Sequence, residues 1–404
     1  MNTDRNRNIL TKIKKKSLNL LCFILPKKFI LFEFQRIKLK KLYKICFYIK
    51  TNEKYQEEEL KEIKFTTAIQ SLCFSPCGNY LAVGDKFTKC NIYNVNTLFT
   101  ELFGTLFKTI TLPNFFIVSQ IKYSKSGTYF AISSEYVQYA VYKIDEDQNY
   151  NSILLFSDYV IFINEEVFAP ICFSSCEKYF LTVETDKLNV IHLIAYNLSD
   201  SSKLKEFKNN YNKNDSIKNN IIITIEYNDY YSNGLIAIGC ASGHLVILNG
   251  NFDDLSTLGQ IIFEFKCIPD LSDMSFSTNI LIAITWSGDI SLFTFGYTNC
   301  IKDNSKTLSI KHQYEENISV CCFTGDISPS GKMFITGTDS NKYYLFKIEE
   351  NYSNYSSKGI KISRQLTTRG KLNVNQEWVS SVAFSNKGDL FATGCLDFRV
   401  KIYC

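Results

Sequence analysis

Cysteine and histidine are the residue types in this chain that metal binding or nucleophilic catalysis would use. The sequence contains 14 Cys and three His. Two cysteine pairs have a spacing seen in metal ligands, Cys73-x3-Cys77 and Cys172-x3-Cys176, but neither has a second His/Cys pair nearby to complete a tetrahedral zinc site. Both pairs occupy the same position in two copies of a repeated segment, so common repeat ancestry explains them. The sequence therefore predicts no metal site.

The three histidines do not suggest a catalytic site. His192 and His244 lie in or beside expected strands, and His312 lies in a segment between repeats. A catalytic assignment needs a nucleophile or an acid oriented by a partner, and no spacing brings His, Cys and Asp together. The phosphate-cradling patterns GxxxxGK[ST] and GxGxxG are absent as well. We therefore predict that the protein is not an enzyme and needs no cofactor, and we assign no catalytic or cofactor-binding residue.

A repeated segment defines the elements that would position any functional residue. Each copy has an apolar strand, a polar turn rich in Ser, Pro, Gly and Asn, and a second apolar strand. The best preserved copy is SLCFSPCGNYLAVGD at 71–85, and its last clear relative is SVAFSNKGDLFATGC at 381–395. The other copies lie at 120–134, 170–184, 233–250, 279–296 and 326–338.

Seven such units follow one another along the chain. Their predicted turn residues are Gly78, Gly127, Glu177, Asn233, Asn279, Gly331 and Gly388. A period of about 50 residues, made of short strands, is typical of a four-stranded propeller blade. A third strand is readable in every unit, at 91–95, 140–144, 190–194, 245–249, 291–295, 344–348 and 400–404.

The last unit ends at its third strand and lacks an outer one. The segment 59–65, just before the first repeat, has the right length and pattern to fill that place. A ring closed by pairing the two ends of the repeat region leaves no exposed sheet edge between its first and last blades. The sequence thus predicts an all-β, seven-bladed propeller over residues 59–404 and a basic, disordered extension over residues 1–58.

This layout resembles the WD-repeat propeller family. No unit ends in the Trp-Asp pair of that family, although an aromatic residue is kept at the Trp position in five of the seven units. The turn Asp of the family is matched at Asp397. The resemblance implies a non-catalytic scaffold that mediates protein–protein interactions, as one subunit of a larger complex.

Cysteine usage and charge bear on where the protein acts. Scattered thiols without a secretory signal predict a reducing environment inside the cell, either cytoplasm or nucleus. Residues 1–50 contain 14 Lys/Arg and two acids, a net charge of +12. The remaining 31 basic and 38 acidic residues give the rest of the chain a net charge of −7. A basic arm therefore precedes a mildly acidic body.

Four interpretations of the basic arm remain open. Lysine clusters alternating with Leu, Ile and Phe could bind an anionic membrane surface. They could also bind nucleic acid or direct nuclear import. An organelle-targeting extension is the third interpretation. The fourth is a segment without structure, or one that is not part of the native protein, because its monotonous composition resembles translated AT-rich sequence.

Two long polar segments, 197–220 and 349–359, lack apolar periodicity and fall between the repeats. We expect both to be disordered surface insertions.

The predicted binding surface is the rim formed by turns between second and third strands and by the loops that enter each blade. Tryptophan and arginine often dominate binding surfaces. The candidate rim residues are Lys86, His244, Trp286, Lys342, Trp378, Phe398 and Arg399. Two other hypotheses stay open: a peripheral membrane or phosphoinositide-binding propeller that uses the basic arm, and a propeller enzyme. An enzyme would need convergent acids or His in the central channel, and an apolar or Ser/Thr-lined channel would exclude it.

Overall fold

The computed structural model divides the chain into two units, Met1–Glu57 and Glu58–Cys404. The described residues all belong to the second unit, and the predicted extension over residues 1–58 lies outside them. No helix with the length and apolarity needed to cross a bilayer occurs among the described residues. The residues that the structure describes are 59–86, 89–95, 101–111, 117–134, 138–144, 152–159, 169–185, 191–207, 221–229, 234–266, 270–299, 306–351, 359–365 and 377–404.

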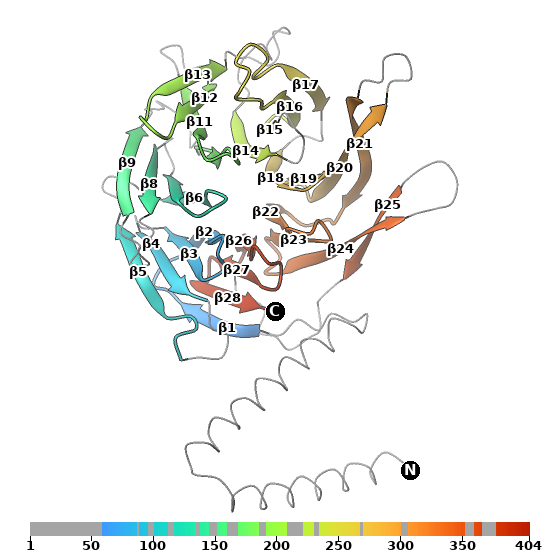
Figure 1. The fold of residues 1–404 in the computed structure, drawn as a ribbon. Coiled ribbons are helices and arrows are strands. Elements are labelled where there is room, and N and C mark those ends of the chain that lie inside the picture. Colours follow the sequence, from blue (N-terminus) through green and yellow to red (C-terminus); the bar gives the residue numbers. More distant parts are fainter. Residues whose placement is uncertain are drawn as a thin grey trace, which may run out of the picture. The chain divides into compact units, whose positions relative to one another are not determined.

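The second unit is a ring of seven four-stranded antiparallel sheets (Figure 1). In each of the first six sheets the strands follow in chain order, the first strand lying next to the channel and the fourth on the outside. The predicted fold class, a seven-bladed β-propeller, is confirmed.

The blades are numbered in chain order, and their strands have the following bounds. Blade 1 contains β2 Ile69–Phe74, β3 Tyr80–Asp85, β4 Lys89–Asn94 and β5 Leu106–Thr111. Blade 2 contains β6 Val118–Tyr123, β7 Tyr129–Ser134, β8 Gln138–Ile144 and β9 Ser152–Tyr159. Blade 3 contains β10 Cys172–Phe173, β11 Tyr179–Thr185, β12 Ile191–Asn197 and β13 Lys203–Phe207.

The remaining blades follow the same plan. Blade 4 contains β14 Ile222–Asn228, β15 Leu235–Cys240, β16 His244–Asn249 and β17 Ile261–Lys266. Blade 5 contains β18 Leu271–Ser277, β19 Ile280–Thr285, β20 Asp289–Asn299 and β21 Lys306–Asn317. Blade 6 contains β22 Cys322–Ile327, β23 Met333–Thr338, β24 Tyr343–Asn351 and β25 Gly359–Gln365. Blade 7 contains β26 Val379–Phe384, β27 Phe391–Cys395, β28 Arg399–Tyr403 and β1 Glu59–Lys64.

Blade 7 joins the two ends of the ring. β1 pairs antiparallel with β28, from Glu59 opposite Tyr403 to Lys64 opposite Arg399; in Figure 1 the blue β1 lies beside the red β28. The almost fully buried Lys401 ammonium reinforces this pairing, with its Nζ 3.4 Å from a Glu59 carboxylate oxygen. The predicted closure by residues 59–65 is confirmed.

The polar turn of the repeat has a recurring hydrogen bond. In blade 1 the Ser75 hydroxyl accepts the backbone N–H of Tyr80 at 3.0 Å. The same bond occurs in blades 2, 3, 6 and 7, where the accepting hydroxyl groups belong to serines 124, 174, 328 and 385. This side-chain bond ties the end of the first strand to the start of the second, which explains why serine recurs there.

Positive φ angles locate the turn residues. They coincide with the predicted positions in five blades, including Glu177 of blade 3 with φ 56°. In blades 4 and 5 the prediction is wrong by one residue, because positive φ falls at Gly234 and Thr278. The β18–β19 connection is a two-residue turn, with Ser277 paired to Ile280, so its length differs from that of the best preserved repeat.

Seven apolar clusters fill the spaces between neighbouring blades. Blade 1 and blade 2 approach so closely that a Cβ on Gly84 would lie 2.4 Å from Val118 Cγ1. A Cβ on Gly337 would likewise lie 2.5 Å from the Val379 carbonyl oxygen of blade 7. The glycine near the end of the second strand is therefore explained by blade packing.

The prediction of two disordered polar insertions is partly wrong. Residues 203–207 form β13, the outer strand of blade 3, whose Phe207 side chain is buried. Residues 349–351 complete β24, and Gly359 begins β25. Outer strands bury few side chains, so a polar sequence with one or two apolar residues suffices for them. Residues 208–220 and 352–358 lie outside the described residues.

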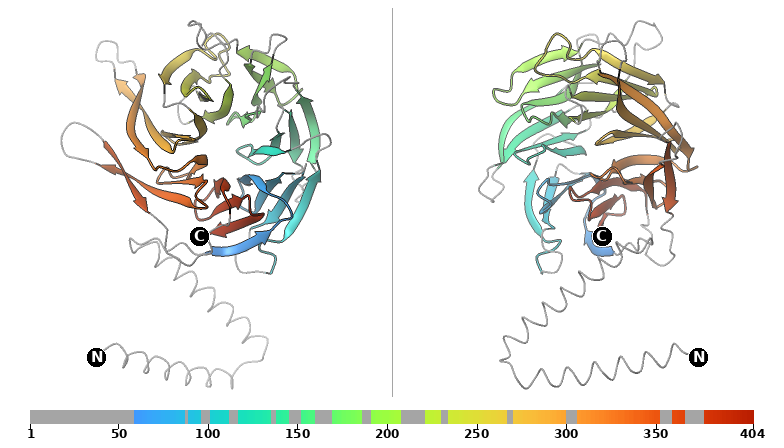
Figure 2. Two further views of the ribbon diagram at one scale, coloured as in Figure 1. Left: turned by 180° about the vertical axis from the view of Figure 1, so that it is seen from behind. Right: turned by 45° about the vertical axis from the view of Figure 1, so that its right-hand side comes forward.

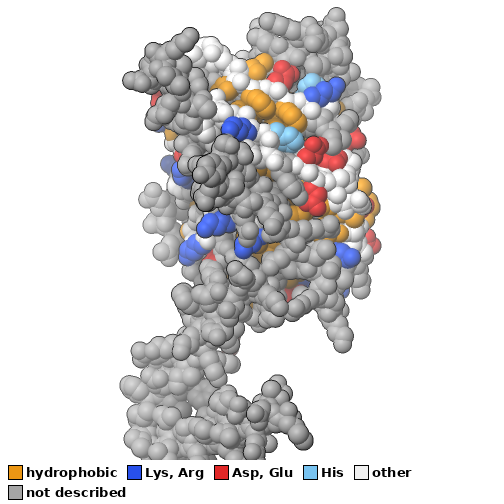
Figure 3. Space-filling model, turned by 90° about the vertical axis from the view of Figure 1, so that its right-hand side faces the viewer, with side chains coloured by type: hydrophobic (Ala, Val, Ile, Leu, Met, Phe, Trp, Pro, Cys, Tyr) orange, Lys and Arg blue, Asp and Glu red, His pale blue; other side chains and the backbone are white. Residues whose placement is uncertain are grey.

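The outer strands of blades 5 and 6 extend away from the ring (Figures 1 and 2). The β20–β21 hairpin pairs from Asp289 to Asn299 on one side and from Asn317 to Lys306 on the other. His312, which was expected between repeats, lies in β21, and its ring is 5.0 Å from that of Phe265 in blade 4. Seen from the side, this surface carries hydrophobic side chains together with both signs of charge (Figure 3).

Candidate functional site: the central channel and its mouth

The innermost strands of six blades line a cavity of about 680 Å³ along the ring axis. This volume lies within the range of small-ligand pockets. The lining changes with depth. Turn and loop residues that include Trp286 and Trp378 contribute at one end, and polar and charged residues of β6, β14, β18 and β22 line it further along the strands.

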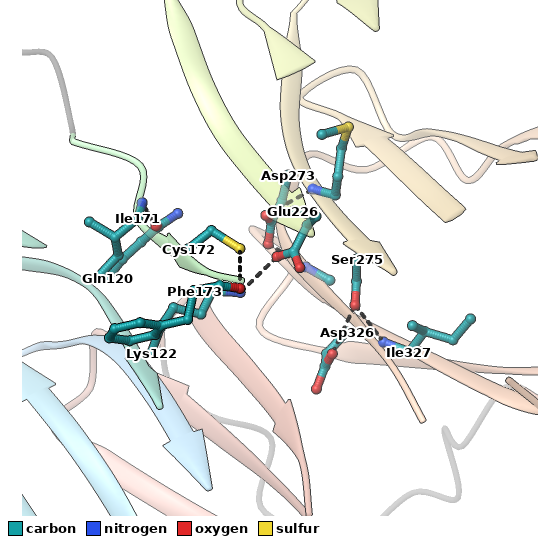
Figure 4. A network of polar contacts seen from close by, with 12 residues as sticks. Gln120, Lys122, Ile171, Cys172, Phe173, Glu226, Asp273, Ser275, Asp326 and Ile327 are labelled. Carbon is teal, nitrogen blue, oxygen red and sulfur yellow. Dashed lines mark hydrogen bonds and ion pairs between the residues drawn. The ribbon is translucent and has the colours of Figure 1, made fainter. Parts of the chain in front are cut away.

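An ion pair spans the channel on the side of blades 2 and 4. Lys122 Nζ in β6 lies 2.7 Å from Glu226 Oε1 in β14 (Figure 4). Burial is the largest single influence and disfavours the lysine charge. The charge and hydrogen bond of Glu226, together with the nearby Cys172 and Asp273, outweigh it and raise the pKa of Lys122. Because blade 3 lies between the two strands, the pair links blades that are not neighbours.

Asp273 and Asp326 connect blades 5, 6 and 7. The Asp273 carboxylate in β18 accepts the N–H of Gly325 in β22 at 3.1 Å. The Asp326 carboxylate accepts the N–H of Phe384 in β26 at 2.7 Å and the hydroxyl of Ser275 at 3.0 Å. The inner strands have no further strand to pair with, so these carboxylates satisfy backbone donors of the adjacent blade.

Both aspartates are difficult to ionise. Burial raises the pKa of Asp273 and of Asp326 to about 6, although the N–H groups of Gly325 and Phe384 act in the opposite direction. Lys122 lowers both values as well. At neutral pH the two groups are mainly ionised, and no cation is paired directly with either of them among the described residues.

The cysteine pairs singled out in the sequence have the same geometry in both blades. The Cys77 sulfur lies 3.3 Å from the Ser75 hydroxyl, and Cys176 lies at the same distance from Ser174. Burial raises the pKa of the Cys73 thiol to about 11, so it is a poor metal ligand or nucleophile at neutral pH. No group of three or more His, Cys, Asp or Glu suited to a metal ion occurs among the described residues.

Three aromatic rings gather at the channel mouth. Phe323, at the entry to β22, lies between Trp286 and Trp378. Its ring centre is 4.9 Å from that of Trp286 in an edge-on contact and 5.1 Å from that of Trp378 in a stacked contact. The tryptophans remain 49% and 46% exposed. We call these three residues the aromatic cluster.

Backbone hydrogen bonds fix the two tryptophans. Trp286 follows β19 and donates its N–H to the Asp270 carbonyl, and the Trp378 carbonyl accepts the N–H of Leu396. Lys86 makes the equivalent bond in blade 1, to Ala68. This backbone bond therefore fixes the same two main-chain positions in each of these repeats. Blade 5 has a tryptophan at one of the two positions, and blade 7 has a tryptophan at the other.

The other candidate rim residues are not in the lining of the channel mouth. Lys86 and Lys342 are exposed. Phe398 is 46% exposed and has a φ of 67°, which is unusual for a residue with a side chain. The His244 ring is largely covered, 3.6 Å from Glu264. Arg399 contacts Glu62 at 3.6 Å and Asp397 at 3.9 Å, so its guanidinium supports the closing blade.

A comparison with protein families agrees with this geometry. The model of the WD domain, G-beta repeat, matches residues 366–404, which include the three C-terminal strands of blade 7. The chain is a WD-repeat β-propeller. No curated protein matches it. Propellers with WD repeats commonly mediate protein–protein interactions and are generally non-catalytic scaffolds.

The channel of this WD-repeat propeller is not the apolar or Ser/Thr-lined channel that would have excluded catalysis. Five charged residues line it. Lys122 and Glu226 pair with each other, and Asp273 and Asp326 bind backbone N–H groups. The fifth, Asp270, is exposed, and its carbonyl accepts the N–H of Trp286. The paired and hydrogen-bonded groups of the channel link the blades to one another. They leave negative charge on the side of blades 5 to 7.

The channel residues were not predicted from the sequence, because the predicted binding surface was placed on turns and loops. A signal was present, since the inner strands of the WD repeats are mainly apolar or Ser/Thr and a charged residue interrupts that pattern at Lys122, Glu226, Asp273 and Asp326. Phe323 likewise stands where other blades of the propeller have Ser119 or Ser380.

Proposed function

We propose that this WD-repeat propeller is a scaffold that binds a protein partner at the mouth of its central channel, with the aromatic cluster as the anchor. The carrying observation is the half-exposure of two tryptophans packed against Phe323. Aromatic side chains in fixed positions lose little conformational entropy on binding and often dominate interface energetics.

The position of the cluster supports this proposal. Its members come from blades 5, 6 and 7, so a partner seated there contacts three blades at once. The rings adjoin a cavity that can receive a projecting side chain. Since the propeller is rigid, surface complementarity is the mechanism, and no chemical step is involved.

The test is quantitative affinity purification of the full-length protein and of the Trp286→Ala/Trp378→Ala variant. Lys332→Ala/Lys387→Ala is the matched control, because these exposed lysines lie in turns at the opposite ends of the inner strands. We expect the aromatic variant to lose a defined set of proteins that the control retains. A protein counts as a partner only if the purified pair binds with the same dependence. An unchanged set in the aromatic variant would place binding elsewhere.

We also propose that the protein acts in a reducing compartment inside the cell. Nine cysteines among the described residues, from Cys73 to Cys395, are free thiols, which supports this placement. Imaging of the tagged full-length protein tests it, and a secreted, disulfide-linked product would contradict it.

A further inference from the structure

The charges of the channel are distributed unequally around its axis. On the side of blades 2 and 4, Lys122 and Glu226 neutralise each other at 2.7 Å. On the side of blades 5 and 6, Asp273 and Asp326 accept hydrogen bonds from neutral backbone groups, and neither forms an ion pair among the described residues. At neutral pH this side of the channel therefore carries net negative charge.

The aromatic cluster lies on that same side. Trp286 follows β19 of blade 5, Phe323 is the second residue of β22 in blade 6, and Trp378 precedes β26 of blade 7. Phe323 and Asp326 are three residues apart on one inner strand, a rise of about 10 Å in extended backbone. All of these residues line the one cavity of about 680 Å³. A side chain that enters past the rings therefore moves toward the carboxylates.

This combination selects a particular ligand chemistry. The face of an aromatic ring attracts a cation, and an arginine guanidinium can also stack on the ring. Carboxylates beyond the rings attract the same cation over a longer range, and salt screens this attraction because the channel is open to water at its mouth. An acidic side chain would meet repulsion, and an aliphatic one would leave the carboxylates without compensation.

We infer that the channel mouth is a subsite for an arginine side chain presented by a basic segment of the protein partner. The guanidinium lies against the aromatic cluster and faces Asp326 and Asp273. This inference rests on the proposed function and specifies the partner chemistry that the same surface recognises.

The two tryptophans of the chain are both in the aromatic cluster, so intrinsic tryptophan fluorescence of the full-length protein reports on this site alone. The probes are the peptide acetyl-Gly-Ser-Arg-Ser-Gly-amide and its versions with Gln, Leu or Glu in the central position. We expect a saturable fluorescence change with the Arg peptide at millimolar concentration. We expect no saturation with the other three.

Two comparisons test the role of the carboxylates. For the wild-type protein, raising the salt concentration from about 50 to about 500 mM should weaken binding of the Arg peptide severalfold. Asp326→Asn should raise its apparent Kd about threefold to tenfold. Asp389→Asn, an exposed carboxylate that binds Ser385 at the opposite end of the strands, should leave it unchanged. Thermal unfolding of each variant checks that the ring is intact.

Equal binding of the Arg and Gln peptides, or saturation by the Leu peptide alone, would overturn the inference. So would an Arg response that neither salt nor Asp326→Asn changes. Failure of the inference is separable from failure of the proposed function. If the aromatic variant loses its protein partners while the Arg peptide does not bind, the scaffold proposal stands and the arginine subsite is wrong. If the partners survive the aromatic variant, the scaffold proposal itself is wrong at this surface.

Discussion

The two sides of the channel link their blades by different interactions between inner strands. On one side, Lys122 of blade 2 reaches Glu226 of blade 4 and forms an ion pair past the short inner strand of blade 3. On the other side, aspartates of blades 5 and 6 bind backbone N–H groups of the next blade directly. The first arrangement is electrically balanced, whereas the second leaves net negative charge below exposed rings.

In this propeller, the side of blades 2 and 4 contributes to stability, and the side of blades 5 to 7 offers charge to a ligand. A balanced pair contributes to ring closure and offers little to a ligand, because each charge already has its counterpart. Uncompensated carboxylates cost stability, since burial disfavours their ionised form, and they are available to attract a cation. Three predictions test this contrast, from the largest expected effect to the smallest.

Removing the cation from the balanced side should have the largest effect on stability. Lys122→Met leaves the Glu226 carboxylate, whose side chain is 16% exposed, without its partner. We expect the free energy of unfolding to fall by about 1–3 kcal/mol, less than for a fully buried pair because the lysine is 35% exposed. Urea denaturation followed by circular dichroism measures this change.

The control for that prediction removes both charges. Lys122→Met/Glu226→Gln should recover stability to within about 1 kcal/mol of the wild type, because no unpaired charge remains. If the double variant is as unstable as Lys122→Met alone, packing and not charge balance explains the loss, and the contrast between the two sides fails.

Removing the central ring of the aromatic cluster should have an intermediate effect. Phe323→Ala deletes the ring that separates Trp286 from Trp378. We expect a loss of about 1–2 kcal/mol, because the ring is only partly buried, and a red shift of tryptophan emission as both indoles become more hydrated. Ser119→Ala, at the equivalent position on the balanced side, should change neither quantity appreciably. Unchanged emission in Phe323→Ala would mean that the three rings do not form a cluster in solution.

Neutralising one aspartate should give the smallest effect, and the effect should depend on pH. The pKa of Asp326 in the folded protein is about 6, against 3.8 for the ordinary side chain. The folded state therefore binds more protons than the unfolded state between about pH 4 and pH 6, and stability falls as the pH rises through this range. Because Asp326 is partly open to channel water, we expect about 1–2 kcal/mol from this carboxyl.

The Asp326→Asn variant isolates that contribution. Its amide oxygen can still accept the N–H of Phe384, and its NH₂ can donate to Ser275. We expect the variant to match the wild type at pH 4 and to exceed it by about 1 kcal/mol at pH 7.5. Urea denaturation at several pH values measures the difference. A variant that is less stable than the wild type at pH 7.5 would show that the ionised carboxylate stabilises the ring.

The fold was predictable because its signal is local and repeated. The serine turn at Ser75 and the glycine at Gly84 recur for reasons that each blade satisfies within itself or against its neighbour. Prediction failed where a blade departs from the common length, as at Thr278, or where an outer strand such as β13 buries too few side chains to show a pattern.

The candidate site was predictable only in part. Trp286 and Trp378 could be proposed from their residue type and their places in the repeat. Phe323, which brings them together, comes from a third blade, and the carboxylates below it are 53 residues apart in sequence. Such a grouping depends on how seven blades are arranged around an axis, and no single repeat contains that information.

The pairing of β1 with β28 has a consequence for biosynthesis. Lys64 faces Arg399, a partner 335 positions later in the chain. At a translation rate of about 5–20 residues per second, β1 leaves the ribosome tens of seconds before the strand that covers its edge. Blades 1 to 6 can form as they emerge, but the ring stays open until β28 has been translated. Premature termination before β28 is complete would therefore leave unpaired strand edges and a nascent chain that depends on chaperones.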